Sequence, residues 1–460
     1  MEQSSKRRKL AYEQLETLGE GTPETFLVFM QEWSLYVPFK TLWQTIRDNK
    51  ALVLQFNGLA DNEWWRIKVN DDFYDAYDTF VDDATGNVKD YFLNWMKITM
   101  EISEQMWTKP WKLVYMLCYG TMNLLSRQKT LKRGDFVYLD FVTRNIFDTL
   151  DRSTGGMIYS SMQTLVFSWN WVTSKQEDNF HIPVPLPIRY RPVRNGCAFG
   201  NDTFLNWVFY DRKKKILITD IVAHEDIGFT DFSYTDLILF GSFILNTNDN
   251  FRRISIPTED YYDITILNQN FYAIRNKIFK WPQKFVYEFD VPKDASVEYI
   301  VGPFNFQDNN FSFVTNDESG RKLAILENNK IVEKDAIFFY GEIKPFSYGF
   351  IFSTIQLFLA SGVIINLQYE VGTYQLILSV CGPFMLIMFG KEMRAVDLWN
   401  TLQNLRSEKM AFISSKHCYN CGLIASLECQ ECDITLCSEE CGRELHNTEI
   451  STKKKCIHIQ

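Results

Sequence analysis

Residues 309–343, NNFSFVTNDESGRKLAILENNKIVEKDAIFFYGEI, alternate apolar and polar side chains and are interrupted twice by clusters of turn-forming residues. Such alternation is the period of a half-buried β-strand, because successive side chains on a strand point to opposite faces. The clusters at 316–320 and 328–329 carry the Asn, Asp, Ser and Gly residues that favour turns. The stretch therefore predicts an antiparallel meander.

The same pattern extends on both sides of this stretch, with turn residues every eight to twelve positions from about residue 134 to 390. Residues 205–222, LNWVFYDRKKKILITDIV, predict two further strands around a charged turn. We therefore expect a β-rich central domain over 133–390. No internal sequence repeat is visible in it.

The residues before this domain follow a helical pattern instead. Apolar side chains recur at spacings of three and four, and Thr22-Pro23-Glu24 is a helix start with a capping hydroxyl ahead of proline. We expect a helical module over 16–74 and a helical extension over 75–132. A linking helix is expected over 391–412, where three leucines share one face: Leu398, Leu402 and Leu405.

The overall composition is that of a globular, acidic chain. Of its 460 residues 46% are hydrophobic and 15% aromatic, so sizeable cores can form. The net charge of −9 gives no general attraction to nucleic acid or anionic lipid. We therefore expect no nucleic-acid partner, and we expect a membrane partner only if the apolar segment 346–390 provides one.

The N-terminus indicates an unsecreted protein. It has no apolar signal region. A protein that is not secreted is expected in a reducing compartment, where clustered cysteines are metal ligands more often than disulfides. The basic run Lys6-Arg7-Arg8-Lys9 is either a nuclear import signal or part of a solvated, flexible terminus over 1–15. The expected location is the cytoplasm or the nucleus.

Residues 346–390 are the one segment long enough to raise a membrane alternative. They contain two uncharged runs separated by Glu370. The first run holds several Ser, Thr, Asn and Gln residues, and Pro383 interrupts the second. Buried strands are therefore expected here rather than a membrane-inserted hairpin.

No catalytic signature is present in the sequence. Phosphate-binding glycine motifs, HExxH and GxSxG are all absent. Cys118, Cys197 and Cys381 lie in apolar or glycine-bearing surroundings and are interpreted as ordinary buried thiols. We therefore expect a non-enzymatic protein.

The C-terminal tail, over 413–460, concentrates the chain's remaining cysteines. Two Cys-x2-Cys pairs are followed by two cysteines one helical turn apart and then by histidines. Zinc takes four N or S ligands in a tetrahedron, and its bonds supply folding energy that so short a segment lacks. The spacing predicts two structural zinc sites with eight ligands: Cys418, Cys421, Cys429, Cys432, Cys437, Cys441, His446 and His458.

This tail resembles the cross-brace zinc fingers of the B-box, MYND and HIT-type group. The resemblance implies that the first and third ligand pairs hold one zinc, so Cys418, Cys421, Cys437 and Cys441 would form the first site. The second site would be formed by Cys429, Cys432 and His446, closed by either His458 or Cys456. A finger of this type would bind an unidentified protein partner.

The N-terminal module resembles a degenerate F-box, a helical motif that docks onto the adaptor subunit of cullin-based ubiquitin ligases. A proline-acidic start, an apolar helix and a closing Trp-Trp-Arg segment carry the resemblance, and the continuation is similar to F-box proteins of protists and large DNA viruses. The matching positions are Pro23, Phe26, Leu27, Met30, Phe39, Leu42, Ile46, Leu52 and Trp65. The resemblance implies an adaptor partner that binds 16–74.

Together these features predict an α+β multidomain protein with a helical F-box-like module, a β-rich centre and a small two-zinc finger. The expected function is that of a substrate-recruiting subunit of a cullin-based ubiquitin ligase. One alternative is a zinc-finger scaffold or structural protein, for example of a large DNA virus, that has no role in ubiquitin transfer. The other is a membrane-associated protein with a hairpin over 346–390.

Overall fold

The computed structural model describes residues 2–18, 22–99 and 107–139, the strands with most of their turns between 152 and 405, and, in the tail, residue 418 and three short strands. The chain forms two compact units. Met1–Leu124 and Trp399–Gln460 make a helical unit, and Leu125–Leu398 make a β unit.

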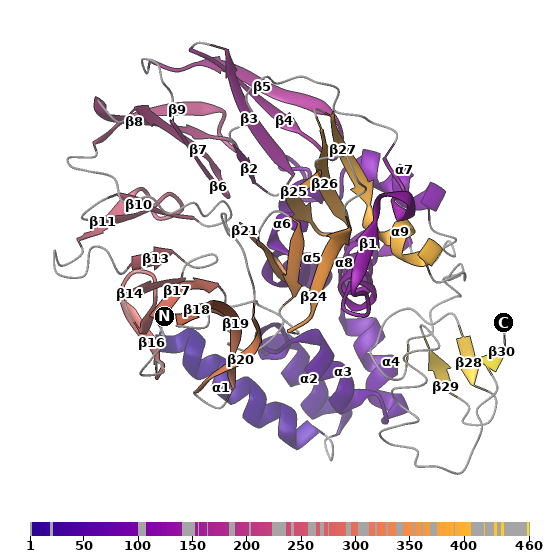
Figure 1. The fold of residues 1–460 in the computed structure, drawn as a ribbon. Coiled ribbons are helices and arrows are strands. Elements are labelled where there is room, and N and C mark those ends of the chain that lie inside the picture. Colours follow the sequence, from indigo (N-terminus) through magenta and orange to yellow (C-terminus); the bar gives the residue numbers. More distant parts are fainter. Residues whose placement is uncertain are drawn as a thin grey trace. The chain divides into compact units, whose positions relative to one another are not determined.

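The helical unit contains the predicted N-terminal helices (Figure 1). Those described are α1 (Glu2–Thr17), α2 (Pro23–Glu32), the 3-10 helix η2 (Ser34–Tyr36), α3 (Phe39–Ile46), α4 (Lys50–Leu59), α5 (Asn62–Asp72), α6 (Tyr74–Phe80), α7 (Asp90–Thr99), α8 (Pro110–Leu125) and α9 (Leu398–Leu405).

Three of these helices begin at a capping side chain. Thr22 caps α2, Asn49 caps α4 and Asp61 caps α5, and each side-chain oxygen accepts a hydrogen bond from a backbone N–H of the first turn. Such a cap contributes about 1 kcal/mol. The helix start expected at Thr22 and Pro23 is confirmed.

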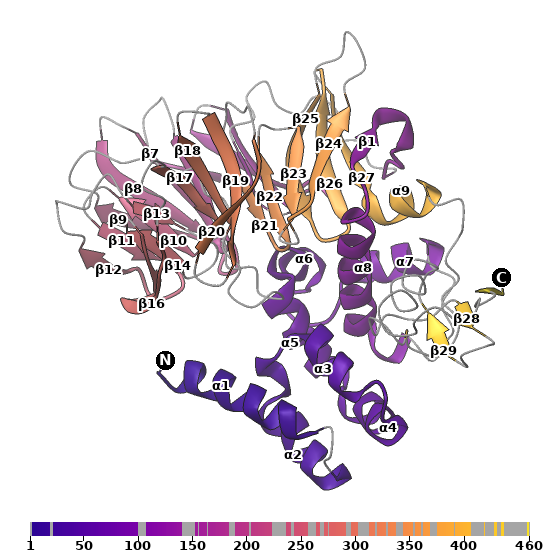
Figure 2. The same ribbon diagram turned by 60° about the horizontal axis from the view of Figure 1, so that its bottom comes forward.

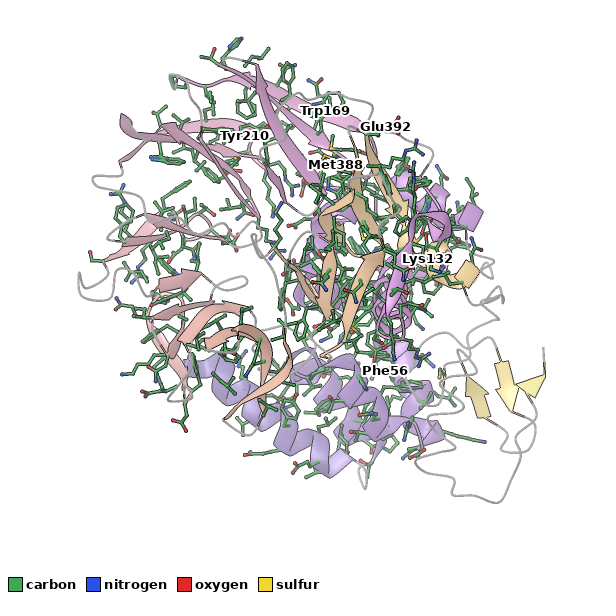
Figure 3. The ribbon with its side chains drawn as sticks, in the orientation of Figure 1. Phe56, Lys132, Trp169, Tyr210, Met388 and Glu392 are labelled. Carbon is green, nitrogen blue, oxygen red and sulfur yellow. The ribbon has the colours of Figure 1, made fainter. Side chains whose placement is uncertain are left out.

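Aromatic side chains fill the core of the helical unit. The ring of Phe39 lies 5.3 Å from that of Trp65 and 5.5 Å from that of Tyr115, in edge-to-face arrangements. Phe56, which is labelled in Figure 3, lies 6.1 Å from Phe39 between α3 and α5. On α8, Gly120 leaves space for the indole of Trp399, because a Cβ atom there would lie 2.5 Å from that ring.

The N-terminal segment is a helix, which corrects the expectation of a flexible terminus over 1–15. Ala11 and Leu15 of α1 are buried, and the helix contacts α2, α3 and η2. Arg7 donates a hydrogen bond from Nη1 to the hydroxyl of Tyr36 at 3.1 Å. Apolar residues four apart hold the helix against its neighbours, a pattern that the basic run obscured in the sequence.

Strands that follow one another in the sequence form seven antiparallel meanders within the described part of the β unit (Figure 1). The first four are β2 (Arg152–Thr154), β3 (Met157–Met162), β4 (Leu165–Asn170) and β5 (Lys175–His181); β6 (Arg189–Val193), β7 (Gly196–Asn201), β8 (Phe204–Asp211) and β9 (Ile216–Val222); β10 (Leu237–Phe240), β11 (Phe243–Asn246) and β12 (Arg252–Ser255); and β13 (Ile264–Ile266), β14 (Phe271–Ile274), β15 (Lys277–Lys280) and β16 (Lys284–Glu288).

The fifth meander contains the stretch on which the sequence analysis began. The last three are β17 (Ser296–Val301), β18 (Ser312–Asp317), β19 (Gly320–Glu327) and β20 (Lys330–Ala336); β21 (Lys344–Phe346), β22 (Gly349–Phe352), β23 (Gln356–Leu359) and β24 (Ile364–Gln368); and β25 (Gln375–Cys381), β26 (Phe384–Phe389) and β27 (Glu392–Asp397). The strands predicted in 205–222, in 309–343 and across 346–390 are confirmed.

Neighbouring sheets pack face to face. The β6–β9, β10–β12 and β13–β16 sheets each contribute buried residues to two of the cores between sheets. In β7, Cys197 and Phe199 pack against the β2–β5 sheet, whereas Ala198 between them packs towards the β10–β12 sheet. Tyr210 of β8, labelled in Figure 3, belongs to the first of these cores, and Trp207 belongs to the second. Further cores join the β10–β12 sheet to the β13–β16 sheet and that sheet to the β17–β20 sheet.

In six of the seven described meanders the first strand lies next to the first strand of a neighbouring meander. These contacts join β21 to β25, β25 to β2, β2 to β6, β6 to β10 and β10 to β13, which Figure 1 labels. Figure 2 turns the β unit so that strands β21 to β27 can be followed. With the core between the β13–β16 and β17–β20 sheets, the contacts connect the seven sheets in one continuous series. Meanders arranged radially in this way, with their first strands innermost, define a β-propeller.

The start of the β unit forms a strap across its last two sheets. β1 (Thr130–Lys132) pairs in parallel with β24. A few residues later Leu139 donates its N–H to the carbonyl of Ala395 at 3.0 Å, and Asp397 donates its N–H to the carbonyl of Val137 at 2.8 Å. The β25–β27 sheet thus receives an additional edge segment from the other end of the β unit.

Residues 392–397 form strand β27, which corrects the linking helix expected over 391–412. Strand β27 pairs with β26 on one side and with the strap on the other, and its residues Met393, Ala395 and Val396 are buried. This strand pairing overrides the helical pattern read in that stretch. The helix starts only at Leu398, and residues 406–412 lie outside the described residues. None of the helices that the structure describes is both long and apolar enough to cross a membrane.

Candidate functional site

The tail forms a small antiparallel sheet around two of the predicted zinc ligands. Its strands are β28 (Leu427–Cys429), β29 (Ile434–Leu436) and β30 (His458–Ile459), in the order β29-β28-β30. In this register Cys429 is the direct partner of His458. Directly opposed positions on antiparallel strands have Cβ atoms about 4.5–5.5 Å apart.

The register brings two predicted ligands of the second site to paired backbone positions. A thiolate and an imidazole at opposed positions are ligand types that zinc accepts together. Cys432 follows β28 in the sequence and lies outside the described residues. Of the two residues predicted to close the second site, His458 is the one that is described, on the strand that pairs with β28 at Cys429.

The remaining predicted ligands fall mostly outside the described residues. Of the first site only Cys418 is described, and of the second only the backbones of Cys429 and His458. Within the described part of the chain no three His, Cys, Asp or Glu side chains form a metal-binding group. The predicted ligands and the alternative outside the description are Cys421, Cys432, Cys437, Cys441, His446 and Cys456.

Cys418 is buried against the N-terminal helices. Its exposed fraction is 0%, and its carbonyl oxygen accepts a hydrogen bond from the indole Nε1 of Trp43 at 3.0 Å. Trp43 is itself 2% exposed on α3. The first predicted zinc ligand therefore lies directly on the helical module.

The helices α2 to α5 contain every position that carries the F-box resemblance. Leu27 is half-buried and Pro23 is exposed at the first turn of α2. The buried positions are Phe26, Met30, Phe39, Leu42, Ile46, Leu52 and Trp65. These side chains form a core, so they are unavailable for direct contact with a partner.

Two large aliphatic side chains point outward from the same pair of helices. Val28 on α2 is 49% exposed and Leu54 on α4 is 73% exposed, and the two helices pack on each other. Gln55, beside Leu54, donates a hydrogen bond from Nε2 to the carbonyl of Pro23 at 2.7 Å. We use the name α2–α4 surface for these two exposed positions, one on each helix.

A buried polar cluster joins helix α5 to helix α8. The Lys68 ammonium is 3.3 Å from an Asp72 carboxylate oxygen and donates to the carbonyl of Val37 at 3.1 Å. The hydroxyl of Tyr115 donates to Asp72 at 2.9 Å. Burial, and then the carboxylate of Asp72, raise the pKa of Tyr115 well above its ordinary value, so this hydroxyl keeps the proton that it donates to Asp72.

Lys112 is buried in apolar surroundings one turn before Tyr115. It is 7% exposed, and its ammonium lies 5.7 Å from the ring centre of Trp65. Burial first, and then the positive charge of Lys109, lower the pKa of Lys112 to about 7. The charged form is therefore disfavoured in the folded protein.

The pKa of Lys112 predicts a pH dependence of stability. Because the folded pKa lies below the unfolded value, the unfolded state binds more protons between about pH 7 and pH 10, and stability should rise with pH in that window by at most about 1.4 kcal/mol per unit. Urea unfolding of the full chain from pH 6 to 10 measures it. Lys112→Met should remove this rise and Lys40→Met, an exposed control, should retain it; equal slopes in both variants would contradict the assignment.

Sequence reasoning missed Trp43, Lys112 and the α2–α4 surface. A lysine inside the apolar run WKLVYMLCY was a visible signal for Lys112. Helical periodicity puts Val28 on the face of its helix opposite to Phe26 and Phe29, so its exposure could have been inferred. Nothing in the sequence indicated that Trp43 meets the tail.

Comparison with known proteins does not assign this chain to a protein family. No protein-family model matches it, and no curated protein matches it. Similar solved structures include a catalytically inactive virginiamycin B lyase from Staphylococcus aureus with quinupristin, at 13% identity over 54% of this chain and 92% of the lyase, with a TM-score of 0.38.

Two further similar structures are the WD40 repeats of RRP9 and the N-terminal domain of Nup159. The first is 10% identical over 57% of this chain and 98% of that chain, with a TM-score of 0.35. The second is 9% identical over 59% and 91%, with a TM-score of 0.32. The β-propeller architecture assigned above rests on the sheet order and packing of this chain.

Proposed function

We propose that this chain is a non-enzymatic interaction protein that acts as an F-box-type, substrate-recruiting subunit of a cullin-based ubiquitin ligase. Its helical module binds the adaptor subunit, and the β-propeller offers a separate surface to a substrate protein. Two zinc ions stabilise the tail as a further protein-binding module. With four protein ligands each, these ions hold the fold and leave no open position for catalysis.

The observation that carries the proposal is the α2–α4 surface. Val28 and Leu54 are exposed on two helices whose buried apolar side chains form a core. Burying a Val or Leu side chain against a partner contributes roughly 1.5–3 kcal/mol. Two such residues on adjacent helices give a partner helix an apolar contact without disturbing the core of the module.

Charge substitution on this surface tests adaptor binding. We expect the double variant Val28→Asp with Leu54→Asp to weaken binding of the cullin-ligase adaptor at least roughly tenfold, because carboxylates at these positions must be desolvated on binding. Calorimetric titration of the full chain with purified adaptor measures this. Both positions are exposed, so the variant should fold.

A matched control uses an exposed apolar residue elsewhere in the helical unit. Ile98 on α7 is 85% exposed, and Ile98→Asp should leave adaptor binding unchanged. If the folded wild-type chain shows no adaptor binding at micromolar concentration, the ligase proposal fails, and the scaffold alternative takes its place. Equal losses in the double variant and the control would remove the α2–α4 surface from the interface.

A further inference from the structure

The contact between Trp43 and Cys418 joins two parts of the helical unit that are distant in sequence. Trp43 packs within the aromatic core, with its ring 6.2 Å from Phe39 and 6.4 Å from Phe56. Its Nε1 donates to the Cys418 carbonyl at 3.0 Å, and both residues are buried. An indole N–H in such a place costs free energy when it has no acceptor.

We propose that metal binding in the tail and the packing of the helical module are thermodynamically linked through this contact. The inference rests on the proposed zinc sites, in which Cys418 is a ligand of the first. A zinc ion bound there restricts the backbone around Cys418, and that same backbone supplies the acceptor for Trp43. Docking on α3 in turn holds Cys418 in one arrangement, which reduces the ordering that metal binding requires.

Such linkage is reciprocal. If the docked helical module raises the zinc affinity of the first site by some factor, bound zinc must favour docking by the same factor. A buried hydrogen bond of ordinary strength corresponds to roughly a three- to tenfold change in affinity. We assign the linkage to the first site because Cys418, whose carbonyl accepts from Trp43, is a predicted ligand of that site.

Two tryptophan substitutions separate linkage from loss of stability. Trp43→Phe removes the donor to Cys418. Trp64→Phe is the matched control, because Trp64 is also a buried tryptophan of this core and donates from Nε1 to the hydroxyl of Ser34 at 2.8 Å, away from the tail. Both are made in a full-length Cys429→Ser background, so that only the first site remains, and zinc affinity is measured by competition with a chromophoric chelator.

We expect Trp43→Phe to weaken zinc binding at the first site roughly three- to tenfold and Trp64→Phe to leave it unchanged. Equal affinities in the two variants would overturn the linkage. The wild-type chain provides a second measurement that needs no substitution. Removing zinc with a chelator should accelerate amide hydrogen exchange in α3 while strands β18 to β20 exchange as before.

The outcomes distinguish the linkage from the zinc sites on which it rests. A wild-type chain that binds two zinc ions, yet exchanges the α3 amides at the same rate with and without them, contradicts the linkage alone. A chain that binds no zinc contradicts both. Loss of exchange protection in β18 to β20 as well as in α3 would mean general unfolding and would also overturn the proposal.

Discussion

Full-length protein purified without chelators is expected to carry two zinc ions, and removing them should unfold the tail. Zinc binding at structural sites is worth about 10–16 kcal/mol in small zinc-dependent peptides, which far exceeds the stability that a three-stranded sheet with a two-residue edge strand could have by itself. Elemental analysis gives the stoichiometry. Proteolysis with and without chelator should show cleavage confined to 413–460.

The register of the tail sheet refines this prediction. Because Cys429 opposes His458, both Cys429→Ser and His458→Ala should lower the zinc content from two to one per chain. Cys456→Ser is the matched control and should retain both ions. One ion in the Cys456 variant and two in the His458 variant would assign the closing ligand to Cys456 instead.

The strap across the last two sheets should be a major source of stability in the β unit. Leu139→Pro removes the N–H that donates to Ala395 and prevents the segment from pairing with β27. The unmade backbone hydrogen bond and the lost buried side chain together should cost about 3 kcal/mol or more, which lowers the melting temperature of a unit of this size by roughly 5–10 °C. Calorimetry of the full chain measures the transition.

Leu139→Ala controls for the loss of the side chain. Leu139 is 6% exposed, so alanine also destabilises the β unit, but the backbone hydrogen bond to Ala395 remains. The proline variant should therefore melt clearly below the alanine variant. Coincident transitions would show that backbone pairing of the strap contributes little to the stability of the β unit.

Local features of the fold could be predicted from the sequence because their causes are local. The cap at Thr22, the buried positions Phe26 and Leu42, and the strands around the turn at 316–320 each follow from residues within one element. Period and turn chemistry are sufficient for such features.

The β-propeller could not be read in this way, because its sheets repeat a geometry without repeating residues. The two faces of β7 are buried against two different sheets, through Phe199 on one face and Ala198 on the other. Burial of this kind constrains only the size and apolarity of the residue at each position. The strap depends on pairing between Leu139 and Ala395, which no local pattern encodes. The same holds for Trp43 and Cys418, whose contact joins the two ends of the chain.

The candidate site divides similarly. The zinc sites were predicted from ligand spacing alone, and they stay a prediction. Our preference for His458 over Cys456 comes from the register of β28 and β30, which the sequence does not reveal. The α2–α4 surface needed the exposed fractions of side chains that periodicity assigns only to one helix face or another.

Hydrogen exchange on the full-length chain, with and without the cullin-ligase adaptor, tests the proposed function most directly because it locates the interface. Our account predicts slower exchange in α2 and α4, which carry Val28 and Leu54, and no change in the strands of the β unit. Unchanged exchange in both helices at saturating adaptor, or protection confined to the β unit, would contradict it.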